Sequence, residues 1–183
     1  MSERSLKFKL LIPFIFLNLF ILFGSILWSY FESVKEKKVY IKSKFKIMEE
    51  EERLLNDIAQ IAAQDAILIS LNENIVKAIK YKNRKKLLKL TQKFLHSLQR
   101  TFPYHYYVHY HLPGGISLLR SWKPYKFGDN ISAFRKMVIW VQKTFQPAWG
   151  IELGRVGLAV RGIAPIVEEI SNKKKLLGSV EVF

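Results

Sequence analysis

The chain has 183 residues and a formal net charge of +15 at pH 7, with 30 Lys and Arg against 15 Asp and Glu. It contains no cysteine, which excludes a disulfide framework and a cysteine nucleophile. Once an apolar N-terminal segment is set aside, about 150 residues remain, a length typical of one compact domain with a stalk.

Residues 10–31 are almost entirely apolar or aromatic. A helix that rises ~1.5 Å per residue needs roughly 20 residues to cross the hydrocarbon core of a bilayer, so this segment predicts one transmembrane helix. A cleavable signal peptide is the alternative. The apolar run exceeds the usual ~7–15 residues, however, and no small-x-small cleavage site follows it. We therefore predict an uncleaved signal anchor at residues 10–31 and a cytoplasmic tail at residues 1–9.

The orientation of this anchor follows from the lengths of the two flanks. Basic residues lie on both sides, and counting them alone mildly favours a cytoplasmic C-terminal part. A nine-residue tail is easily kept inside, whereas long folded domains cross the membrane largely regardless of their charge. We expect the N-terminus inside and the C-terminal domain outside the cytoplasm.

A stalk helix is predicted for residues 32–70, because this stretch contains neither proline nor glycine. Its apolar positions follow a three-four spacing; they are Ile47, Leu54, Ile58, Ile61 and Leu68. This pattern favours a helix that pairs with a second copy, and so a homodimer through the stalk.

The part after the stalk is strongly basic, with Asp129 as the only acid between Asn74 and Trp149. Such charge can attract nucleic-acid phosphates or lipid headgroups, but a solvated helix face is the more common explanation. No nucleic-acid motif is present, so we expect no nucleic-acid partner.

Two short helices are predicted next, one capped by Asn72 or Asn74 and one over residues 84–100. Strand patterns then cover residues 106–112 and 116–120, joined by a Pro-Gly-Gly turn. A helix over residues 131–144, capped by Asp129 or Asn130, separates this hairpin from strands at 148–153, 158–167 and 176–183. The order predicts an α+β fold: a PAS-like five-stranded antiparallel sheet with helices on one face and the long helix alongside.

Three sequence segments, taken in chain order, resemble the corresponding segments of one known family. They are His109-Tyr110-His111-Leu112-Pro113-Gly114-Gly115-Ile116-Ser117-Leu118-Leu119-Arg120, then Lys123-Pro124-Tyr125-Lys126-Phe127-Gly128-Asp129 with Arg135, then residues 150–166 with Gly178-Ser179-Val180-Glu181. They are similar to the double Cache (double sensory) domain of bacterial chemoreceptors, sensor histidine kinases and diguanylate cyclases, over roughly residues 40–183.

The resemblance implies a periplasmic ligand-sensing module at residues 71–183 of a protein anchored in the inner membrane. Receptors of this kind normally carry a second sensory module, a second transmembrane helix and a cytoplasmic output domain. This sequence resembles one module, which implies that the output domain is missing or lies on another chain.

In such domains the ligand lies between the sheet and the segments that cover one face, and several side chains here suit a small anionic or zwitterionic ligand. Arginine holds carboxylates bidentately, aromatic rings form apolar walls, and acids accept an amine. The candidates are Arg120, Arg135, Arg155 and Arg161 as anchors, Trp122, Tyr125 and Trp149 as walls, and Asp129 and Glu152 as amine acceptors. The alternative is that Asp129 only caps a helix and that Glu152 pairs internally with Arg155 or Arg161.

No enzymatic motif and no cofactor motif is found, so we expect neither catalysis nor a cofactor. His109 and His111, two apart on one predicted strand, are weak candidates for a metal pair, because no third ligand lies nearby in the sequence. The competing function is a membrane-anchored dimerisation or partner-docking module without a ligand. A fold whose interior is filled by Trp122 and Trp149 would favour it.

Overall fold

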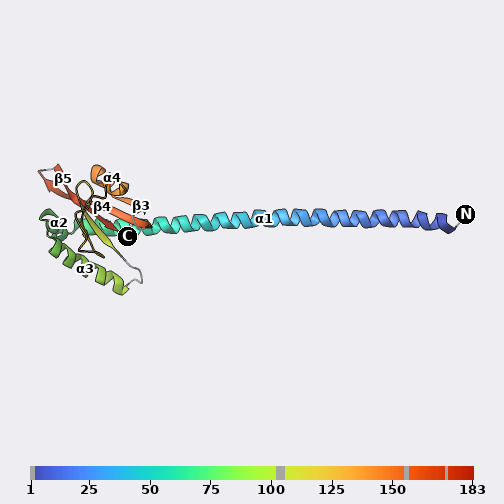
Figure 1. Ribbon diagram of the computed structural model, residues 1–183, viewed down its shortest axis with the longest axis horizontal. Coiled ribbons are helices and arrows are strands. Elements are labelled where there is room, and N and C mark those ends of the chain that lie inside the picture. Colours follow the sequence, from blue (N-terminus) through green and yellow to red (C-terminus); the bar gives the residue numbers. More distant parts are fainter. Residues whose placement is uncertain (1–2, 102–105, 155–156, 172) are drawn as a thin grey trace. The chain divides into compact units, whose positions relative to one another are not determined.

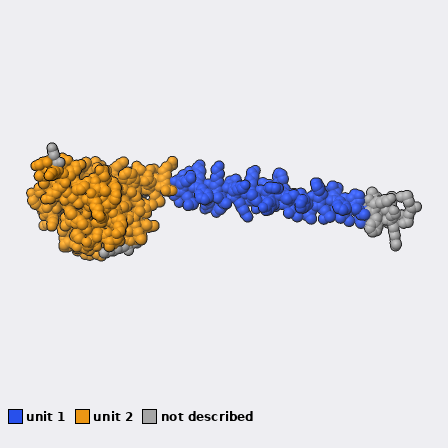
Figure 2. All heavy atoms as spheres, turned by 90° about the horizontal axis from the view of Figure 1, so that it is seen from above, with its two compact units in different colours: residues 1–51 blue, residues 52–183 orange. Residues whose placement is uncertain are grey.

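The structure is a computed structural model that describes residues 3–101, 106–154, 157–171 and 173–183. Helix α1 (Glu3–Leu71) contains both the predicted anchor and the predicted stalk (Figure 1). The chain divides into two compact units, Met1–Glu51 and Glu52–Phe183, coloured separately in Figure 2. Within the described part, α1 is the one helix whose length and apolar composition would let it cross a membrane.

Helix α2 (Glu73–Lys80) begins at the predicted cap. The side chain of Asn72 accepts hydrogen bonds from the backbone N–H groups of Asn74 and Ile75, which would otherwise lack helical partners. Helix α3 (Arg84–Thr101) follows, with Leu87, Thr91 and Leu95 as its buried positions. Both helices therefore match the sequence prediction to within about a residue.

The five strands form one antiparallel sheet, as predicted. They are β1 (Val108–Leu112), β2 (Ile116–Arg120), β3 (Ala148–Leu153), β4 (Leu158–Ile170) and β5 (Lys173–Val182). Their spatial order is β2-β1-β5-β4-β3, so the last strand of the chain lies at the centre of the sheet. Strands β4 and β5 both extend further toward their shared turn than the sequence pattern indicated.

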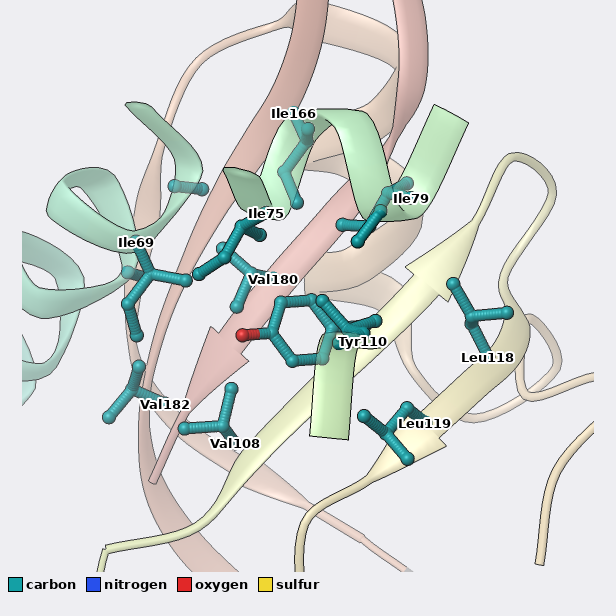
Figure 3. Close-up of a cluster of buried hydrophobic side chains, with 14 of the residues drawn as sticks. Ile69, Ile75, Ile79, Val108, Tyr110, Leu118, Leu119, Ile166, Val180 and Val182 are labelled. Carbon is teal, nitrogen blue, oxygen red and sulfur yellow. The ribbon is translucent and has the colours of Figure 1, made fainter. Parts of the chain in front are cut away.

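The two faces of the sheet carry different side chains because β-strand residues alternate in direction. On β5, Val180 and Val182 belong to an apolar cluster that includes residues of α1, α2 and α3. Tyr110 of β1 lies in the middle of this cluster, between side chains of the helices and the strands (Figure 3). Its hydroxyl lies 3.0 Å from the Thr91 hydroxyl, so the buried phenol has a hydrogen-bond partner.

Helix α4 (Lys136–Thr144) packs against the opposite face, where Val138 and Val141 contact Ile163 in a second apolar cluster. The prediction of helices on one face only is therefore wrong: α2 and α3 lie on one side of the strands and α4 on the other (Figure 1). The predicted start of this helix at residue 131 is also wrong, and so is its capping by Asp129 or Asn130.

The later start of α4 has a physical cause. Asn130 accepts a hydrogen bond from the Ser132 backbone and so stabilises a turn in front of the helix. The helix itself begins beside Glu152 of β3, whose Oε1 accepts the backbone N–H of Met137 at 2.9 Å. The Glu152 carboxylate, from a strand that follows α4 in the sequence, thus caps the N-terminus of α4 and complements the helix dipole.

Candidate functional site

The face of the sheet that carries α4 is polar along its centre. Its buried polar residues from β1, β2, β4 and β5 are His109, His111, Ser117, Arg120, Arg161, Ser179 and Glu181. On β1, β4 and β5 they alternate with apolar residues that face the other side, so the same pleat that builds the core collects polar groups on its reverse. Buried polar groups cost free energy unless they are paired, and this face is accordingly rich in ion pairs.

Glu181 is the centre of these ion pairs and is fully buried. Its Oε1 accepts hydrogen bonds from Arg135, which precedes α4, and from Arg161 of β4, the latter at 2.6 Å. Arg135 also donates from Nε to Glu152 Oε2 at 2.7 Å. Two arginines and two carboxylates therefore form a charge-balanced cluster that joins α4 to three strands.

A second ion pair fixes the loop that follows β2. Arg120 donates bidentately to Asp129, at 2.8 and 2.9 Å, and also to the carbonyl oxygen of Lys126 at 2.9 Å. The fork of a guanidinium fits a carboxylate in this way, which gives the pair both strength and direction. The loop between residues 121 and 129 is thereby held against the end of β2.

The two histidines lie side by side, as their spacing predicted, with ring centroids 4.0 Å apart. His109 Nε2 lies 2.8 Å from the Ser117 hydroxyl and His111 Nδ1 lies 3.2 Å from the Ser179 hydroxyl. The remaining nitrogens face Glu181 Oε2, at 3.6 Å for His109 Nδ1 and 3.7 Å for His111 Nε2. These distances are too long for hydrogen bonds.

The buried surroundings shift the pKa values of His109, His111 and Glu181. Burial lowers the pKa of His109, and burial together with the neighbouring His109 holds the pKa of His111 well below its ordinary value. Burial alone would raise the pKa of Glu181, but His109 and Arg135 outweigh it and keep that pKa well below the usual range. At neutral pH the cluster therefore contains neutral imidazoles and an ionised carboxylate.

Beside these groups a cavity of about 470 Å³ opens between the sheet and the loop after β2. Its walls include four aromatic rings, from Tyr107, Trp122, Phe134 and Phe183. Five basic side chains also line it: Arg120, Lys123, Lys126, Arg135 and Arg161. Among the described residues that line the cavity there is no carboxylate, because Asp129, Glu152 and Glu181 lie behind the arginines that they hold.

The predicted site residues fall into four groups. Four of them line the cavity together: Arg120, Trp122, Arg135 and Arg161. Asp129 and Glu152 pair with the arginines of this group, so the internal pairing of Glu152 is with Arg135. Arg155 lies outside the described residues.

Tyr125 and Trp149 are not part of the cavity. Tyr125 is 79% exposed. Trp149 stands opposite Gly162 in the β3–β4 register, and Gly162 faces α1, so the indole lies on the reverse of the sheet. There its Nε1 donates to Asn56 at 3.3 Å.

Sequence reasoning missed Glu181, Lys123, Lys126 and the aromatic residues Tyr107, Phe134 and Phe183. The alternation of Ser179, Val180, Glu181 and Val182 indicated a strand with one polar face. It did not indicate that this face is buried, because the covering segments lie far away in the sequence.

Comparison with known proteins identifies a family and similar solved structures. The family described as the double sensory domain of two-component sensor kinases matches residues 43–183. The sensor domain of the V. cholerae histidine kinase DctB is similar in structure, with 14% identity and a TM-score of 0.48, over 76% of this chain and 56% of that one. No curated protein matches the chain. Because the family match covers more than half of the chain, the protein belongs to the double sensory domain family, whose members are Cache-type sensory domains of signal-transduction receptors.

Proposed function

We propose that the chain is a membrane-anchored, extracytoplasmic sensory domain and that its cavity binds a small anionic ligand. The observation that carries the proposal is the lining of the cavity, where five basic side chains and four aromatic rings meet without a carboxylate among the described lining residues. An anion with an apolar body fits such walls, because the basic groups attract its charge and the rings cover its carbon atoms.

The zwitterionic alternative has less support. An amine needs an acceptor, and the two acids predicted for that role are engaged by arginines and by the backbone of Met137. The docking alternative depended on a filled interior, whereas Trp122 borders an open cavity and Trp149 lies on the other face. We therefore favour an anionic ligand over both.

Binding would act through the loop after β2 and through the segment before α4. Lys123 and Lys126 belong to this loop, and Arg135 joins α4 to the sheet through Glu181. A ligand that contacts both segments and the sheet would favour one arrangement of the three, which is a shift between two populations.

A thermal-shift screen of the full chain in detergent tests this function. The probes are small mono- and dicarboxylates, amino acids, phosphate and sulfate, with neutral sugars as the uncharged comparison. We expect at least one anion to raise the Tm of the wild type, and to do so much less in the double variant Lys123→Gln/Lys126→Gln. Both lysines are exposed, so the exchange leaves the fold intact.

The matched control is Lys173→Gln/Lys174→Gln, which removes the same charge from the exposed start of β5, far from the cavity lining. Equal responses of the two double variants would contradict the assignment of the cavity. The absence of any stabilising anion would contradict the ligand class.

A further inference from the structure

His109, which lines the cavity, forms a buried group with His111 and Glu181, which do not line it. One nitrogen from each imidazole and one carboxylate oxygen lie within 4.8 Å of one another. All three side chains are buried, and two of the three atoms, His111 Nε2 and Glu181 Oε2, have no hydrogen-bond partner among the described residues. Unpaired buried polar atoms are rare, and these two face each other.

We propose that His109 Nδ1, His111 Nε2 and Glu181 Oε2 form a binding site for a divalent transition-metal ion of the Zn²⁺ class. Two histidines and a carboxylate are a donor set that such ions prefer, while Mg²⁺ and Ca²⁺ prefer oxygen ligands alone. The proposed metal ligands are not among the side chains assigned to the anionic ligand, although the His109 ring also lines the cavity.

The spacing of the donors distinguishes a metal ion from a water molecule. The two nitrogens lie 3.6 and 3.7 Å from Glu181 Oε2. For a metal ion with bonds of ~2.1 Å, these separations correspond to nitrogen–metal–oxygen angles of about 120°, close to those of a four-coordinate site. For a water molecule with hydrogen bonds of ~2.8 Å, the angle at the water oxygen between the nitrogen and Glu181 Oε2 would be only about 80°. This is well below the angle at which water bonds two partners.

The outer contacts of the three residues are those of metal ligands. Each imidazole places its other nitrogen against a hydroxyl, Ser117 for His109 and Ser179 for His111. The other oxygen of Glu181 accepts from Arg135 and Arg161. Such second contacts fix the tautomer and the ring orientation and leave the inner atoms free for the ion.

The positive charges of the nearby arginines would repel a bound cation, but these charges are offset by paired carboxylates. Arg135 and Arg161 are balanced by Glu152 and Glu181, so these four charges sum to zero. Both guanidinium groups bond Glu181 through Oε1, whereas the proposed ligand atom is Oε2.

The test is a calorimetric titration of the tag-free full chain in detergent with Zn²⁺, in the wild type and in His111→Asn. Asparagine can keep the contact with Ser179 through its amide but lacks the atom at the Nε2 position. We expect one Zn²⁺ per chain in the wild type and at least a tenfold loss of affinity in His111→Asn. The matched control is His96→Asn on α3, an exposed histidine, which should bind as the wild type does.

X-ray absorption of the zinc-loaded wild type keeps the proposal testable if His111→Asn does not fold. Two imidazole ligands and an oxygen ligand at the zinc would support the site. Zinc bound through fewer than two imidazoles, an affinity unchanged by His111→Asn, or no binding by the wild type would each overturn it.

Discussion

At the scale of single residues, Glu181 determines the chemistry of the polar face. Among the described residues it is the only carboxylate that pairs with both Arg135 and Arg161. Charges are expensive to bury, and each is stable here because its partner is present. The neutral amide of glutamine would leave Arg161 without a carboxylate partner among the described residues and Arg135 with Glu152 alone, one negative charge for two buried guanidinium groups.

Glu181→Gln is therefore expected to lower the free energy of unfolding by about 3 kcal/mol or more, the usual effect of removing one partner from a buried ion pair. Urea denaturation of the full chain in mild detergent, followed by tryptophan fluorescence, measures the change. Glu169→Gln is the control because Glu169 lies exposed on β4, and its effect should stay within about 0.5 kcal/mol. Equal stability of Glu181→Gln and the control would show that the ion pairs do not hold α4 to the sheet.

At the scale of secondary-structure elements, the contact between α1 and β4 depends on Gly162. A Cβ at this position would lie 1.9 Å from the backbone nitrogen of Ala63 and 2.1 Å from the backbone carbon of Ala62. The buried face of α1 consists largely of alanines, so the helix backbone approaches the strand directly. Arg161, the neighbour of Gly162, points to the cavity side. The peptide that joins Arg161 to Gly162 therefore has the cavity on one side and α1 on the other.

Gly162→Ala is expected to destabilise the domain by about 2 kcal/mol or more, because backbone atoms cannot yield as a flexible side chain can. The measurement is the thermal unfolding of the full chain followed by circular dichroism. Gly24→Ala is the control, since nothing lies within 4 Å of a Cβ at that helical position. A Gly162→Ala protein as stable as the Gly24→Ala protein would contradict the close packing of α1 on β4.

The elements that could be predicted are those with local causes. Asn72 caps α2 through its own neighbours, and the two glycines after Pro113 form the turn of the first hairpin, with positive φ angles at both. The start of α4 could not be predicted, because its cap is Glu152 from a strand that follows it. The cavity was predicted only in part: its arginines were named, whereas the pairing through Glu181 requires the sheet order.

At the scale of the whole molecule, the proposed membrane anchor predicts a topology for the sensory domain. Helix α1 contains residues 11–31, whose apolar side chains are exposed in the structure, as expected for a segment that faces lipid. With a short tail inside, the domain that follows would lie outside the cytoplasm.

Alkaline phosphatase fused after Phe183 is expected to be active, since this enzyme requires an oxidising compartment for its disulfides. The control is the same enzyme fused after Lys9, before the apolar segment, which should remain inactive in the cytoplasm. Activity of the second fusion and not of the first would reverse the topology.

The central position of β5 determines when the sheet can form during synthesis. In the order β2-β1-β5-β4-β3, the strand made last lies between the first hairpin and the β3–β4 pair. Until residues 173–182 have been synthesised, β1 and β4 each present an unpaired edge, and Arg135 and Arg161 have no Glu181 to hold them. The nascent chain must therefore be kept from aggregating until its last strand arrives, and completion of the fold coincides with completion of the ion-pair cluster.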